Sequence, residues 1–182
     1  MFAKEYLTIN PLGTIPFMID GETKMTESSG ICYYLGTKYG PTPLVVRQDD
    51  PAYGAFLNWM YFSDATLTFP QTLVLRYSQL EPEERRNPQV AGDYAKWFLG
   101  RLRAVEAATA SAETLCAGRF TAADIVNGYA LRLAGNIGLA KDFGPNVAAY
   151  WARLQERDGY QRAVAAERKA GIEQNVAPRI RA

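Results

Sequence analysis

The sequence predicts an α+β fold that is mostly helical, with a small mixed unit followed by an all-helical part. Turn and strand signals are confined to residues 1–40, whereas apolar residues recur at helical spacing from residue 51 onward. Between the two parts, residues 41–50 are rich in proline and polar residues, which is typical of a linker. We therefore expect a mixed unit at residues 1–40, a linker at 41–50 and an all-helical domain at 51–182.

Composition and charge exclude several classes of protein. The chain has 182 residues, and its 20 basic and 19 acidic side chains give a net charge of +1. Such a balance lacks the electrostatic footprint of a protein that binds nucleic acid or an anionic membrane. No apolar run approaches the roughly 18 residues of a membrane span, and the first residues lack the apolar stretch of a secretory signal. We expect a cytoplasmic protein with no nucleic-acid and no membrane partner.

The absence of histidine restricts the chemistry of the chain. It excludes Ser-His-Asp and Cys-His catalysis and the commonest zinc sites. The two cysteines, Cys32 and Cys116, match no metal-ligand spacing, and we expect both to be free thiols in a reducing compartment. No metal is expected.

A β-hairpin and a helix are predicted within residues 1–40. Asp20-Gly21 is typical of a tight hairpin turn of the I′ type, here between a strand at Ile15–Ile19 and a short strand at Thr23–Met25. Pro16 is tolerated because it lies at the beginning of its strand. We expect Thr26 to cap the next helix, which carries an apolar stripe and ends before Gly40-Pro41. The stripe consists of Ile31, Tyr34 and Leu35.

Beyond the linker the sequence predicts a series of helices. The first runs from Pro51 to about Leu80 and is interrupted near Pro70; the second covers Val90–Leu115. Thr121 and Asp124 form a capping box, in which each side chain satisfies a backbone N–H of the other residue. Two shorter helices follow, one marked by Val147, Tyr150, Trp151 and Leu154 and one at Tyr160–Arg168, before a loosely held tail at Gly171–Ala182.

Two segments together carry a resemblance to a known family. The first is the Asn-Pro-x-Gly-x-Ile-Pro stretch at residues 10–16, followed by Asp20-Gly21 and Glu27-Ser28; the second is the capping segment at residues 118–125. In this order they resemble the cytosolic glutathione S-transferases of bacterial type. The resemblance implies a thioredoxin-like glutathione-binding domain joined to a helical bundle. It also implies conjugation of the co-substrate glutathione to small hydrophobic electrophiles.

The resemblance also implies the residues that bind glutathione. In the family, the peptide bond before the proline matching Pro16 is cis, and the backbone of the residue matching Ile15 pairs with the cysteinyl part of glutathione as a strand would. Ser28 and the free N–H groups of a helix N-terminus suit the γ-glutamyl carboxylate. Glu27 suits the γ-glutamyl ammonium.

Further site residues follow from the same likeness. The electrophile is expected to lie against the first helix of the helical domain, with Tyr61, Phe62, Thr66 and Phe69 as candidates. The alternative is that this aromatic stripe belongs to the core. Asp64 is a candidate for a contact with glutathione across the interface of a homodimer.

The family places a β-α-β unit ahead of the proline motif, with the Tyr, Ser or Cys that activates the glutathione thiol. Such a unit takes ~30 or more residues, and only nine residues precede Asn10. We expect the truncated thioredoxin-like part to lack that residue, and we assign no catalytic residue. Tyr6 lies in an expected short helix and is not nominated.

The chain as written is therefore expected to show little or no conjugation. A gene start placed too late, a genuinely shortened relative, and strand exchange between two chains stay open as explanations. The alternative function is a non-catalytic binding or interaction module.

Overall fold

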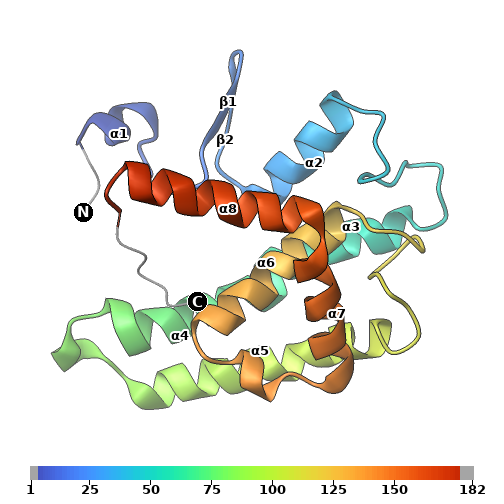
Figure 1. Ribbon diagram of the computed structural model, residues 1–182. Helices are drawn as coiled ribbons and strands as arrows, with labels where there is room; N and C mark the ends of the chain where they lie inside the picture. The colour runs from blue at the N-terminus through green and yellow to red at the C-terminus, as the bar shows by residue number, and fades with distance from the viewer. Residues whose placement is uncertain (1–3, 177–182) are drawn as a thin grey trace.

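The computed structural model describes residues 4–176 and confirms an α+β fold that is mostly helical (Figure 1). Between residues 4 and 40 the chain forms a small β-hairpin and two helices, and from there to residue 176 it forms only helices and loops. None of the helices in the described range is long and apolar enough to cross a membrane. The α-helices are α1 (Lys4–Ile9), α2 (Ser28–Lys38), α3 (Tyr53–Phe62), α4 (Phe69–Leu75), α5 (Pro88–Ala108), α6 (Ala122–Asn136), α7 (Pro145–Glu156) and α8 (Asp158–Glu173).

The hairpin pairs two short antiparallel strands, β1 (Met18–Asp20) and β2 (Thr23–Met25), and projects from the helices in Figure 1. The two turn residues are Gly21 and Glu22, because Asp20 already pairs with Thr23 at the end of β1. Gly21 has a φ of +59°, but Glu22 is not among the residues with a positive φ, so a tight turn is present while the expected I′ type at Asp20-Gly21 is wrong. The expected strand at Ile15–Ile19 is wrong in its boundaries, because pairing begins only at Met18, opposite Met25. The partner strand has three residues, and Pro16 has no N–H to donate.

Helix α2 begins one residue later than a Thr26 cap would require. Its N-cap residue is Glu27, and the Thr26 hydroxyl donates to the Glu27 carboxylate at 3.2 Å instead of to the helix backbone. The expected Thr26 cap is therefore wrong. The first turn of α2 has no side-chain cap at all.

The long helical run after the linker changes its winding near Pro70, as expected. Helix α3 continues into a π-helical segment, Ser63–Thr68, and α4 follows with Pro70 in its first turn. A second π-helical segment, Arg76–Leu80, ends the run. Proline lacks the N–H for an α-helical bond, and the wider π turn is a recognised adjustment within helices. Three apolar residues of this run, Phe56, Met60 and Leu67, are all buried.

Helix α5 ends at Ala108, so the expected helix to Leu115 is wrong. At its C-terminus the Thr109 hydroxyl donates to the Val105 carbonyl at 2.8 Å. The chain then turns through Ala117 and Gly118, which have φ values of +58° and +60°. Residues 109–121 therefore form a loop that leads back to the start of α6.

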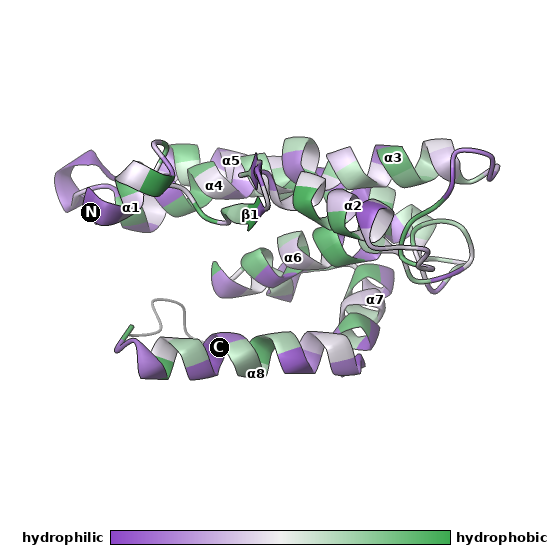
Figure 2. Cartoon of the chain, turned by 90° about the horizontal axis from the view of Figure 1, so that it is seen from above, coloured by the Kyte–Doolittle hydropathy of each residue, from purple (hydrophilic) through white to green (hydrophobic). Residues whose placement is uncertain are grey.

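In Figure 2, helix α6 lies between α3 and α4 on one side and α8 on the other, while α7 packs against both α5 and α6. The small and apolar side chains of α6 pack against α5 and α7, and the cluster includes Phe98, Leu102, Val105, Ala130, Leu131, Ala134, Val147 and Tyr150.

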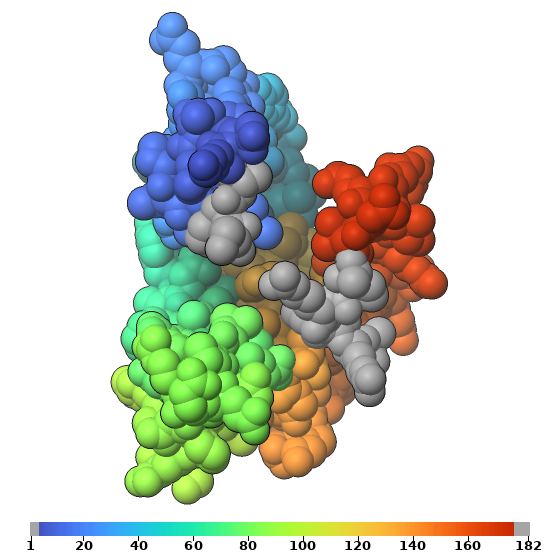
Figure 3. Space-filling model, turned by 90° about the vertical axis from the view of Figure 1, so that its left-hand side faces the viewer, coloured from blue at the N-terminus to red at the C-terminus, as the bar shows by residue number. Residues whose placement is uncertain are grey.

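Helices α7 and α8 extend further than the expected pair. Gly171–Glu173 belongs to α8, whereas residues 177–182 of the expected tail lie outside the described residues. Figure 3 shows a hollow between the N-terminal elements and α8.

The expected capping box is confirmed, and Asp124 does more than cap α6. One carboxylate oxygen accepts from the Thr121 N–H at 2.8 Å and from its hydroxyl at 3.2 Å. The other accepts from the Leu115 N–H at 3.0 Å and from the Tyr150 hydroxyl at 2.9 Å. Burial and the neighbouring Asp124 charge raise the pKa of Tyr150, so its hydroxyl remains a donor.

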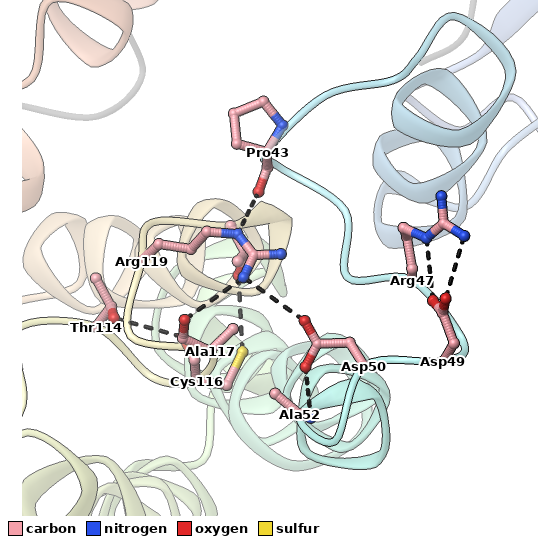
Figure 4. Close-up of polar contacts among 10 residues, drawn as sticks. Pro43, Arg47, Asp49, Asp50, Ala52, Thr114, Cys116, Ala117 and Arg119 are labelled. Atoms are coloured by element: carbon pink, nitrogen blue, oxygen red, sulfur yellow. Dashed lines mark hydrogen bonds and ion pairs between the residues drawn. The ribbon is translucent and has the colours of Figure 1, made fainter.

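The stretch between α2 and α3 is held by Arg119 in the loop before α6 (Figure 4). The guanidinium donates to the Pro43 carbonyl at 3.1 Å and lies 3.9 Å from the Asp50 carboxylate. The Ala122 N–H donates to the Leu44 carbonyl at 2.7 Å. These contacts fix the path by which α2 reaches α3. The domain boundaries expected around residues 41–50 stay a prediction.

Replacing Asp124 by Asn should lower the free energy of unfolding by roughly 2–4 kcal/mol, because an amide N–H₂ would face donors that now bond a carboxylate oxygen. Urea unfolding followed by circular dichroism measures the change. Asp93→Asn, on the exposed face of α5, is the matched control and should change stability by less than about 0.5 kcal/mol. Equal effects of the two substitutions would contradict the role given to Asp124.

Candidate functional site

The segment before the hairpin is a tight loop built around Asn10, which is 1% exposed. The Asn10 carbonyl accepts from the Gly13 N–H at 2.9 Å, and its side-chain oxygen accepts from the Leu12 N–H at 3.1 Å. Its side-chain nitrogen donates to the Thr14 carbonyl at 2.8 Å. Gly13 has a φ of +63°, which a glycine adopts at little cost. The loop therefore presents Thr14–Pro16 in one defined conformation.

The Ile15-Pro16 peptide bond is cis, as expected. Ile15 is 85% exposed. Within residues 4–176, neither its N–H nor its carbonyl makes a hydrogen bond. Ile15 therefore presents a free edge of backbone on which an extended peptide can pair.

The N-terminus of α2 is open. Glu27 and Ser28 are both exposed, and the first intrahelical bond runs from the Ile31 N–H to the Glu27 carbonyl. The N–H groups of residues 28–30 therefore have no partner in the helix. Together with the helix dipole, these donors favour a bound anion.

Two other helix starts are closed by carboxylates of the chain. Asp124 serves α6, and Glu106 accepts from the N–H groups of Asn146 and Val147 at 3.0 and 2.9 Å in the first turn of α7. Helix α2 has no such internal anion, so its positive end is accessible from outside.

A cluster around Asp20 joins the hairpin turn to α2. The carboxylate accepts from Lys38 at 2.8 Å, from the Tyr39 hydroxyl at 2.6 Å and from the Tyr34 hydroxyl at 2.9 Å. These donors, the Lys38 ammonium first, lower the pKa of Asp20 to about 2. The cluster holds the hairpin against the C-terminal half of α2.

Asp64, the candidate for a contact across a dimer interface, is half-buried in the π-helical segment after α3. Burial, with a smaller contribution from the Asp64 charge, raises the pKa of the Cys32 thiol. Cys116 is buried, and burial raises its pKa as well. Neither thiol has the lowered pKa of a reactive cysteine.

The aromatic candidates for an electrophile pocket fall into two groups. Phe62 and Thr66 line a groove of about 470 Å³ together with residues of α5. The α5 residues are Trp97, Gly100, Arg101 and Ala104, and Ala65 completes the lining. Tyr61 and Phe69, which are 70% and 53% exposed, do not line this groove.

Sequence reasoning missed the contacts that shape the Thr14–Pro16 segment. One set of these contacts comes from Asn10. Another comes from Tyr6 of α1, whose hydroxyl donates to the Thr14 carbonyl at 2.6 Å. The spacing of residues in the sequence does not predict a hydrogen bond between a short helix and a loop eight residues later. Asn10 stood within the motif, but its partners depend on the fold of the loop.

Comparisons with a family model and with known sequences agree on one family. A family model described as glutathione S-transferase, N-terminal domain, matches residues 2–43. Glutathione S-transferase hmp2 from Hypomyces subiculosus is 32% identical over 177 residues, which cover 91% of this chain and 81% of that protein. Glutathione S-transferase GstB from Escherichia coli K12 is 26% identical over 163 residues, covering 88% and 77%.

Two solved structures share the fold. The glutathione transferase URE2P6 from Phanerochaete chrysosporium, in complex with oxidised glutathione, matches with a TM-score of 0.79 and 26% identity over 92% of this chain and 79% of that one. Ure2p5 from the same organism, cocrystallised with 1-(S-glutathionyl)-2,4-dinitrobenzene, matches with a TM-score of 0.80 and 22% identity over 93% and 82%.

The Asp20 carboxyl should titrate near pH 2 in the folded protein, well below its ordinary value of 3.8. Because the folded pKa is lowered, the stability contributed by Asp20 is present above about pH 4 and is lost as the pH falls toward 2. Side-chain ¹³C NMR of Asp20 measures the midpoint. Lys38→Met should raise it, whereas Lys24→Met, an exposed lysine of the same hairpin, should not. A wild-type midpoint near 3.8 would refute the cluster.

Proposed function

The chain belongs to the glutathione S-transferase family, and on that premise we propose that it binds glutathione at Ile15, Pro16, Glu27 and Ser28. The proposed reaction is conjugation of glutathione to small hydrophobic electrophiles. The observation that carries the proposal is that the chain has both free backbone groups at Ile15 and an open helix start at Glu27 and Ser28.

Each part of glutathione meets a suitable group. The γ-glutamyl carboxylate would accept from the Ser28 hydroxyl and from the N–H groups of the first turn of α2. The γ-glutamyl ammonium would lie near the Glu27 carboxylate. The cysteinyl backbone would pair with the N–H and carbonyl of Ile15. In the reaction, the glutathione thiol loses its proton to water, and its sulfur bonds to the electrophilic carbon of the second substrate as the leaving group departs with its electron pair.

The electrophile is proposed to be a small aromatic compound with a leaving group. Ure2p5 was crystallised with a glutathionyl dinitrobenzene, which is the conjugate that such a substrate yields. In this chain Phe62, Thr66 and Trp97 line a groove between the segment after α3 and α5. Tyr61 and Phe69 are exposed on the same helical run. We propose the Phe62 and Thr66 side of this groove as the first place to look for the second substrate, and Tyr61 and Phe69 as the place to look in a chain that has no dimer partner on this surface.

No thiol-activating residue is assigned among residues 4–176. The Tyr6 hydroxyl is engaged with Thr14, and the thiols of Cys32 and Cys116 have raised pKa values. A free thiol with a pKa near 8.5 is only a few per cent ionised at pH 7. Binding without activation would therefore support only a slow reaction. The free cysteines fit the reducing conditions of the cytoplasm, where we propose that the protein acts.

We further propose a homodimer that uses the outer surface of α3, α4 and α5. Tyr61, Phe69 and Trp97 are large aromatic side chains that remain 70%, 53% and 46% exposed. Exposed apolar surface of this kind marks interaction sites on soluble proteins. In such a dimer Asp64 is the candidate for a contact with glutathione bound by the other subunit.

Replacing Ser28 by Ala should weaken glutathione binding about tenfold, because a hydrogen bond to a carboxylate is lost. Isothermal titration calorimetry with the full chain measures the dissociation constant. Ser111→Ala, an exposed serine of the loop after α5, is the matched control and should leave it unchanged. Unchanged binding in Ser28→Ala would argue against this placement of the γ-glutamyl end.

The wild-type chain should elute with twice the mass of a single chain in light scattering coupled to size-exclusion chromatography. Trp97→Glu should raise the dimer dissociation constant at least tenfold, because a charge would replace an aromatic contact. Tyr129→Glu, which places the same charge at an exposed aromatic of α6, should have no effect. A monomeric wild type at micromolar concentration would refute the dimer.

A further inference from the structure

The Thr14 carbonyl is held by two donors from different parts of the chain. The Tyr6 hydroxyl donates to it at 2.6 Å, and the Asn10 side-chain nitrogen donates at 2.8 Å. A carbonyl oxygen has two lone pairs, so both sites are filled. The carbonyl direction is therefore set from two sides.

Fixing this carbonyl also fixes the Ile15 N–H. The Thr14 carbonyl and the Ile15 N–H belong to one planar peptide unit, and this unit is trans. In a trans peptide the C=O and N–H bonds point in opposite directions. Because Tyr6 and Asn10 hold the oxygen toward the chain, the Ile15 N–H is held pointing away from it. This is consistent with the absence of a partner for that N–H within residues 4–176.

Tyr6 also contacts the other end of the same loop. Its backbone carbonyl accepts from the Asn10 N–H at 2.9 Å, while its hydroxyl reaches Thr14. Tyr6 therefore spans Asn10–Thr14 with two bonds. The Asn10 side chain is already shared between the Leu12 N–H, the Thr14 carbonyl and the Thr14 hydroxyl, at 3.1, 2.8 and 3.4 Å. Of the two bonds to the Thr14 carbonyl, the one from Tyr6 is the shorter, and it is the one that comes from outside the loop.

We propose that Tyr6 is a positioning residue for the thiol peptide, acting through the Thr14–Ile15 peptide unit. Its hydroxyl orients the Ile15 N–H toward the cysteinyl carbonyl of the bound peptide. The role requires the hydroxyl and not merely the ring, since only the hydroxyl bonds Thr14. The inference rests on the proposed glutathione site and adds a residue to it that does not touch the ligand.

The first test needs no ligand and compares Tyr6→Phe with Tyr39→Phe in the full chain. Tyr39 is a matched control, because its hydroxyl also donates at 2.6 Å, but to Asp20. In ¹³C- and ¹⁵N-resolved NMR spectra, Tyr6→Phe should shift the Thr14 carbonyl and Ile15 amide signals and leave Asp20 unchanged. Tyr39→Phe should do the reverse. An unshifted Ile15 amide in Tyr6→Phe would overturn the proposal.

The second test measures glutathione affinity by calorimetry. Tyr6→Phe should weaken binding about three- to tenfold, the usual effect of one lost hydrogen bond, while Tyr39→Phe should not. A glutathione analogue with the cysteinyl carbonyl reduced to a methylene group removes the partner of the Ile15 N–H. Tyr6→Phe should change the affinity of this analogue much less, since the coupled pair is already broken.

The outcomes separate the two hypotheses. A wild-type chain that does not bind glutathione overturns the proposed function and this role with it. A wild-type chain that binds, with Tyr6→Phe weakening glutathione and its analogue equally, overturns only the role of Tyr6. That result would mean that the hydroxyl affects the stability of the protein and not the orientation of the Ile15 N–H.

Discussion

The buried carboxylate of Asp124 is the interaction on which the rest of the structure depends. It binds the start of α6, the loop after α5 and the Tyr150 hydroxyl of α7 at once. No ion pair neutralises it among the described residues, so its stability comes from four donors converging on two oxygens. The loop that it fixes carries Arg119, which in turn holds the stretch leading from α2. The orientation of the candidate site thus depends on a carboxylate that is not part of it.

Much of the fold could be predicted because its signals are local. A tight hairpin turn at Gly21, the capping box of Thr121 and Asp124, and the interruption near Pro70 each follow from the backbone preferences of a few adjacent residues, and the structure has all three. The cis bond before Pro16 was expected from a family likeness and not from the dipeptide, which is cis in only about 5–6% of cases in folded proteins.

The errors and omissions concern choices that tertiary contacts decide. Apolar spacing continues past Ala108, yet the helix ends there, and further along the Leu115 N–H bonds the Asp124 carboxylate and not a helical carbonyl. Thr26 is a good cap by residue type, but its hydroxyl finds the Glu27 side chain. The Tyr6 bond to Thr14 joins a helix to a loop that no periodicity connects. For the candidate site, the exposed groups that we propose to meet a ligand follow from the motif, whereas the contacts that orient them do not.

The glycine in the groove beside Trp97 has a further consequence. A Cβ placed at Gly100 would meet no atom within 4 Å, and the same holds for Gly92, about two turns earlier on α5. Alanine would strengthen the helix at such positions by about 0.8–1 kcal/mol each. The folding of the isolated chain therefore gives no reason for either glycine. What they provide is bare helix backbone on the outer surface, where another main chain can come closer than any side chain would allow.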